Sequence, residues 1–60
     1  MITITINTEN AAFEGENYGP EVARILRELA NILTADLLPN YAPLPLYDSN
    51  GNRVGKVITS

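Results

Sequence analysis

The sequence predicts an α+β domain in which one helix packs on one face of a three-stranded antiparallel sheet. Three observations lead to this prediction: an alternating apolar and polar segment at the start, a helical apolar repeat in the middle, and two β segments around an Asn-Gly turn at the end. The chain has 60 residues and contains no internal repeat. Residues 1–60 are therefore expected to form a single small domain.

The first predicted element is a strand over residues 1–8, in which side-chain polarity alternates at every position. One face carries isoleucines and the other carries polar side chains: Ile2, Ile4 and Ile6 against Thr3, Thr5 and Asn7. We expect the isoleucines to face the helix. The polar face indicates a sheet that is covered on one side only.

Residues 9–19 mix acids, Asn and Gly, and this composition predicts a loop. Phe13 is expected to anchor the loop in the core, and an exposed contact is the alternative. The loop also carries Glu9, Glu14 and Glu16 and forms, with Glu21, the most acidic part of the chain. We favour a solvated acidic loop, and the alternative is that it imitates phosphates and occupies a basic groove on a partner.

A helix is predicted from Pro20 to about Leu37. Proline suits a first helical turn because its missing N–H has no partner there. The apolar residues repeat at helical spacing: Val22, Ile25, Leu26, Leu29, Ile32, Leu33 and Leu37. Glu21, Arg24 and Glu28 are expected on the opposite, solvent-facing side, and Pro39 ends the helix.

Residues 44–47 and 53–59 predict a β-hairpin around Asp48-Ser-Asn-Gly-Asn52. Asn50-Gly51 supplies the positive φ, either in a two-residue turn or in a type I turn followed by a glycine bulge. Depending on the bulge, either Val54 and Ile58 or Val57 joins the core.

Pro43 and Pro45 cannot donate ladder hydrogen bonds, so residues 44–47 belong at one edge of the sheet. Residues 53–59 then lie in the middle and the first strand lies at the other edge, with antiparallel pairing throughout. This first strand has no Lys, Pro or inward charge to protect its edge.

An unprotected edge predicts a homodimer with paired first strands and a continuous six-stranded sheet; a monomer and a higher oligomer are the alternatives. We expect Thr5→Pro to remove pairing donors from this edge and to abolish the dimer. Tyr41 and Tyr47 are either packing or interface residues. The candidate interface residues are Thr3, Thr5, Asn7, Tyr41, Tyr47, Glu9, Glu14 and Glu16.

Composition argues against several classes of function. The chain has no Cys and no His, which excludes disulfides, thiolate zinc sites and imidazole ligands and removes the commonest catalytic groups. A net charge of −3 argues against direct binding of nucleic acid. Asp48–Asn52 resembles the start of a calcium loop, but Arg53 and Thr59 stand where that loop requires Gly and Glu. We expect no enzymatic activity, cofactor or metal, and a soluble cytoplasmic protein without a membrane segment.

Three short motifs occur together over most of the chain: Asn10-Ala-Ala-Phe13, Ile25-Leu-Arg-Glu-Leu-Ala30 and Asp48-Ser-Asn-Gly-Asn-Arg-Val-Gly55. With the Thr/Ile strand, they resemble a group of very short proteins encoded by phages and prophages. The group has no firmly assigned activity, so the resemblance transfers no functional residues.

The absence of the usual catalytic groups indicates a non-catalytic protein-binding module, which we expect to act as a homodimer through the sheet edge, the uncovered sheet face or the acidic loop. The resemblance implies a setting in the host cytoplasm. The expected role of the module is stoichiometric inhibition of a host defence system or host enzyme, of the anti-CRISPR type. A structural or accessory phage protein that mainly self-associates is the alternative.

Overall fold

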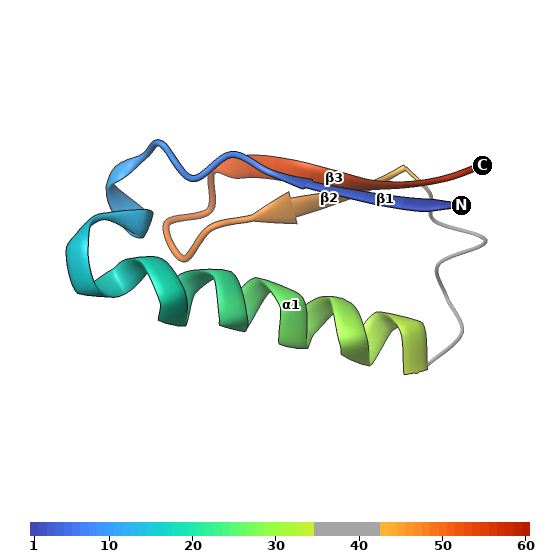
Figure 1. Ribbon diagram of the computed structural model, residues 1–60, viewed down its shortest axis with the longest axis horizontal. Helices are drawn as coiled ribbons and strands as arrows, with labels where there is room; N and C mark the ends of the chain where they lie inside the picture. The colour runs from blue at the N-terminus through green and yellow to red at the C-terminus, as the bar shows by residue number, and fades with distance from the viewer. Residues whose placement is uncertain (35–42) are drawn as a thin grey trace.

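The computed structural model describes residues 1–34 and 43–60. In these residues, three strands form a sheet and helix α1 lies along one of its faces (Figure 1). The strands are β1 (Ile2–Ile6), β2 (Leu44–Tyr47) and β3 (Arg53–Thr59), and α1 spans Tyr18–Thr34. The strand order is β1-β3-β2 and both pairings are antiparallel, which confirms the predicted α+β fold.

The segment between β1 and α1 contains two short 3-10 helices, η1 (Ala11–Phe13) and η2 (Gly15–Asn17), where the composition predicted only a loop. The Asn10 side chain begins η1 by accepting a hydrogen bond of 3.0 Å from the Ala12 N–H. Helix α1 begins at Tyr18 rather than at Pro20, which falls in the first turn. The predicted helix end near Leu37 lies outside the described residues.

The core lies between α1, η1 and the two hairpin strands. Its most buried members are Phe13, Ile25 and Val57, which are between 0% and 2% exposed. Ala12, Leu29, Leu46 and Val54 complete the buried cluster. The expected role of Phe13 as an apolar anchor is therefore confirmed.

The hairpin turn is a type I turn followed by a glycine bulge, the second of the two predicted forms. The Gly51 N–H donates to the Asp48 carbonyl over 3.1 Å, and Gly51 has a φ of 83°. The strand pairing then shifts by one residue, because Leu46 pairs with Gly55 whereas Tyr47 pairs with Arg53. This second bulge leaves Val54 without a partner in β2, although its carbonyl accepts a hydrogen bond from the Asn7 N–H, and its side chain is buried.

The bulge in β3 changes which valines and isoleucines enter the core. Val54 and Val57 are both buried, whereas Ile58 is 37% exposed on the face away from α1. The sequence offered either Val54 with Ile58 or Val57 alone. A bulged strand can turn residues three apart to the same face, which simple alternation does not allow.

Ile2 and Ile4 are not buried, contrary to the expectation from the alternating pattern. Ile4 pairs with Val57 and so shares its helix-side face. Yet Ile2 is 52% exposed and Ile4 is 43% exposed. Helix α1 therefore covers the hairpin strands better than it covers β1.

We predict that Gly55→Ala destabilises the protein strongly. A Cβ atom at this position would lie 1.9 Å from the Thr5 carbonyl oxygen, and the backbone of β1 can move only by breaking its pairing with β3. The free energy of unfolding is expected to fall by about 1–3 kcal/mol or more, as at other overpacked sites. A domain of this size has few kcal/mol of stability in total, so urea denaturation should show an early or absent transition.

Gly19→Ala is the matched control, because no atom lies within 4 Å of a Cβ placed there and the residue is in the first turn of α1. It should leave stability unchanged or raise it by up to about 1 kcal/mol. Equal effects of the two substitutions would contradict the close approach of β1 to Gly55.

Candidate functional site

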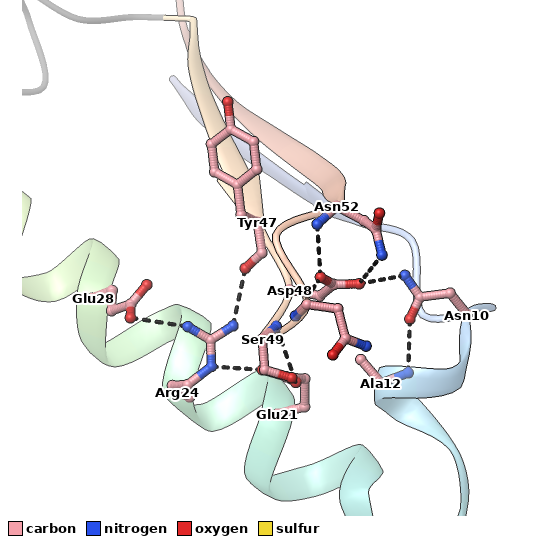
Figure 2. Close-up of polar contacts among 10 residues, drawn as sticks. Asn10, Ala12, Glu21, Arg24, Glu28, Tyr47, Asp48, Ser49 and Asn52 are labelled. Carbon is pink, nitrogen blue, oxygen red and sulfur yellow. Dashed lines mark hydrogen bonds and ion pairs between the residues drawn. The ribbon is translucent and has the colours of Figure 1, made fainter.

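A cluster of polar side chains joins the start of α1 to the hairpin turn (Figure 2). Its centre is Glu21, which is 7% exposed. One Glu21 oxygen accepts a hydrogen bond of 2.6 Å from the Ser49 hydroxyl, and the other accepts one of 2.6 Å from Arg24 Nε. The prediction that Glu21 faces solvent is wrong, because the hairpin turn lies against the first turn of α1 and supplies donors to its carboxylate.

Arg24 extends this cluster to the end of β2. Its guanidinium donates to Glu28 over 2.9 Å and to the Tyr47 carbonyl oxygen over 3.0 Å. Arg24 was also expected to face solvent, and its side chain remains 35% exposed. The contact with Tyr47 fixes the side of α1 that faces the hairpin.

Asp48 organises the hairpin turn itself and is 4% exposed. One carboxylate oxygen accepts from the backbone N–H groups of Asn50 and Asn52, over 2.9 and 2.8 Å. The other accepts from the Asn10 side-chain amide over 2.7 Å. Asp48 therefore acts as the predicted turn residue. Asn10 links the turn to η1, a contact that no sequence pattern indicates.

The electrostatics of the cluster favour ionised carboxylates. The hydrogen bond from Ser49 lowers the pKa of Glu21, and with Arg24 it outweighs the opposing effect of burial. Burial raises the pKa of Asp48, but the hydrogen bonds from Asn52, Asn10 and Asn50 outweigh it and leave the pKa lowered.

A carboxylate whose pKa is lowered is a weak base, so Glu21 is poorly suited to activate the Ser49 hydroxyl. Within residues 1–34 and 43–60, no buried side-chain nitrogen or oxygen lacks a hydrogen-bond partner. The same residues hold no group of three acids placed to bind a metal ion. The polar cluster is thus a structural connection between helix, turn and η1.

The sheet face opposite α1 is the first candidate binding surface, and we call it the open face. Register places on it two threonines, an aromatic residue, two cations, a proline and an isoleucine: Thr3, Thr5, Tyr47, Arg53, Lys56, Pro45 and Ile58. Tyr47 is 49% exposed, and its ring points away from α1 (Figure 2). The strand residues of this face include two cations and no acid.

The second candidate surface is the outer edge of β1. Backbone hydrogen bonds join Met1 to Ser60 and the Asn7 N–H to the Val54 carbonyl. Along an antiparallel strand, the N–H and C=O groups of successive residues point alternately toward the paired strand and away from it. The backbone groups of Thr3 and Thr5 therefore point toward β3. Those of Ile2, Ile4 and Ile6 point outward, where the described residues place no strand.

This alternation corrects the expectation for Thr5→Pro. The Thr5 N–H belongs to the ladder between β1 and β3, so a proline there would break the fold of one copy rather than the outer edge. Ile4 is the central residue of the outer edge.

Exposed apolar side chains border this edge. Leu26 and Leu33 are each 43% exposed and lie on the side of α1 opposite Arg24. Since Arg24 reaches β2 and β1 is the other edge of the sheet, these leucines lie on the β1 side. We call Ile2, Ile4, Leu26 and Leu33 the β1 flank.

The remaining candidate residues are dispersed. Glu9, Glu14 and Glu16 are exposed in the segment between β1 and α1, while the buried Glu21 no longer contributes to that acidic surface. Asn7 is exposed at the end of β1, and its side chain accepts a hydrogen bond from the Glu9 N–H. Tyr41 lies outside the described residues.

Comparisons with protein-family models, with curated proteins and with solved structures find no match to the chain. In the described part of the chain, no helix has the length and apolar character needed to cross a membrane.

We predict that acid destabilises the protein through Glu21 and Asp48. Both have a lowered pKa in the folded chain, so the unfolded chain binds their protons more readily. Their stabilising effect is complete above the ordinary carboxyl pKa of about 4 and is lost as the pH falls through the folded-state pKa. Melting temperature should therefore change little between about pH 7 and 5 and fall below that range.

Glu21→Gln should remove part of this acid dependence, whereas Glu16→Gln changes an exposed side chain of η2 and should leave the profile as in the wild type. Melting curves collected in steps of pH would check both. An unchanged acid profile in Glu21→Gln would show that ionisation of Glu21 does not contribute to the pH dependence of stability.

Proposed function

We propose that the protein is a non-catalytic binding module that docks on another protein through the open face. The observation that carries this proposal is Tyr47, which is half exposed on a sheet face that no described residue covers. Tyrosine and arginine are enriched in protein interfaces, and Tyr47 pairs with Arg53 on this face.

The chemistry of the open face favours an acidic partner surface. Arg53 and Lys56 lie on it with Tyr47 and Ile58, while the glutamates of the segment before α1 lie elsewhere. Interfaces of this kind combine apolar contact at the centre with charge pairing at the rim. We therefore propose a protein partner that presents carboxylates around an apolar patch.

The proposed absence of catalysis is supported by the state of the polar groups. The buried carboxylates of Glu21 and Asp48 are occupied by donors from the fold itself. The sequence supplies no His or Cys as an alternative base or nucleophile.

The proposed setting is the cytoplasm of a bacterial host, where the module would inhibit a host defence protein or a host enzyme stoichiometrically. This part of the proposal is supported by the resemblance to short phage proteins. The second candidate function is a structural or accessory protein that mainly self-associates, and the exposed apolar residues of the β1 flank favour it.

The test is affinity capture from host lysate with two matched tyrosine variants. Tyr47 is 49% exposed on the open face, and Tyr18 is 52% exposed at the start of α1. We expect the wild type and Tyr18→Ser to retain one protein in stoichiometric amount. Tyr47→Ser should bind that protein with an affinity lower by roughly 10-fold or more, as expected for an interface hot spot. Higher salt should weaken the capture, because two cations are involved.

Failure to retain any stoichiometric protein would contradict the inhibitor proposal and favour the self-associating alternative. Retention of the same protein by Tyr47→Ser would exclude the open face as the docking surface.

A further inference from the structure

We infer that the β1 flank binds a second copy of this chain, with the two β1 strands paired antiparallel about Ile4. This inference deepens the proposed function and rests on it, because such a dimer would join two open faces into one larger docking surface.

The outer edge of β1 has backbone groups that can pair with a further strand. Ile2, Ile4 and Ile6 each direct one N–H and one C=O away from β3. The opposite edge of the sheet differs, because β2 contains Pro45 and is preceded by Pro43. Charges and prolines are common means of protecting an edge strand, and Ile2–Ile6 has neither.

The sequence of β1 matches itself when the direction is reversed. Ile-Thr-Ile-Thr-Ile reads the same both ways, and a two-fold axis at Ile4 pairs Ile2 with the partner's Ile6 and Thr3 with the partner's Thr5. All outward N–H and C=O groups of the three isoleucines find partners in this register. Isoleucine then faces isoleucine on the helix side, and threonine faces threonine on the open side.

The side chains around the edge also suit an identical partner. The exposed members Ile2, Ile4, Leu26 and Leu33 are all apolar. The side of α1 that borders β1 adds Val22 and Ala30 and carries no charge. Two copies therefore bring together matching apolar surfaces without placing like charges against each other.

The size of the molecule allows a small specific dimer. The side on which the sheet is seen edge-on above α1 measures 34 Å by 19 Å (Figure 1). A partner that covers this side buries roughly 600 Å² on each copy, and the total of roughly 1,200 Å² is at the lower end of specific interfaces.

The first test is sedimentation of the purified full chain over a range of concentrations. We expect the wild type to be a dimer. Ile4→Lys places two like charges directly opposite each other at the axis and should weaken the dimer by at least about 100-fold. Thr3→Lys is the matched control, because it places the same charge on the open side opposite a threonine, and it should remain dimeric.

The second test fixes the register and does not depend on a destabilising variant. The chain has no Cys, so Ile4→Cys introduces a single thiol. Directly opposite residues of a hydrogen-bonded antiparallel pair have Cα atoms about 5.5 Å apart, which a disulfide can span. With oxidised glutathione as oxidant, Ile4→Cys should form a disulfide-linked dimer. Thr3→Cys should not, because in this register residue 3 of one copy lies opposite Thr5 of the other copy.

A wild-type monomer at millimolar concentration would overturn the inference, and so would equal cross-linking of the two Cys variants. Neither result bears on capture through Tyr47. A monomer that still retains a host protein would leave the proposed function standing, and a dimer that retains none would support the self-associating alternative.

Discussion

The arrangement of the molecule depends on the limited width of one helix laid on three strands. A helix with its side chains is about 10–12 Å wide, whereas strands are spaced by about 4.8 Å and carry side chains beyond the outermost backbone. One helix can therefore cover about two strands fully. In this protein the covered strands are those of the hairpin, since Val57 is 0% and Leu46 is 5% exposed. Ile2 and Ile4 of β1 receive only partial cover.

The polar cluster determines which edge is left uncovered. Glu21 accepts from Ser49, and Arg24 donates to the Tyr47 carbonyl, so α1 is held against the hairpin side of the sheet. Asp48 and Asn10 tie the turn to η1 in the same region. The buried carboxylates of Glu21 and Asp48 are thereby used to build the fold. Among the described residues, the two candidate binding surfaces are the β1 edge with its apolar flank and the open face.

Much of this fold could be predicted because the local patterns are strong. The alternation in Ile2–Ile6, the helical repeat around Ile25 and Leu29, and the Asn50-Gly51 turn each specify one element. The two prolines near β2 then specify the strand order. Phe13, the apolar aromatic residue of the acidic segment, was correctly expected in the core.

The wrong predictions concern contacts between segments that are distant in the sequence, which alternation and helical periodicity do not indicate. Glu21 is buried because a distant turn supplies its donors, and nothing in the spacing of the helix residues indicates that contact. The bulge at Val54 lies next to the close approach of β1 to Gly55, and such a contact between distant strands is not visible in a local pattern. The direction of each N–H and C=O group of β1 depends on its pairing register with β3. From the sequence alone we expected Thr5 to contribute to the outer edge, whereas the register centres that edge on Ile4.

The central claim is that β1 is an edge in one copy and becomes an interior strand when a second copy binds. Amide hydrogen exchange of Ile4, compared with that of Thr5 as the protein is diluted, tests this claim most directly. We expect the Thr5 amide to be protected at all concentrations at which the fold persists, and the Ile4 amide to be protected only at high concentration. Rapid exchange of Ile4 at every concentration, or protection that dilution does not change, would contradict the account.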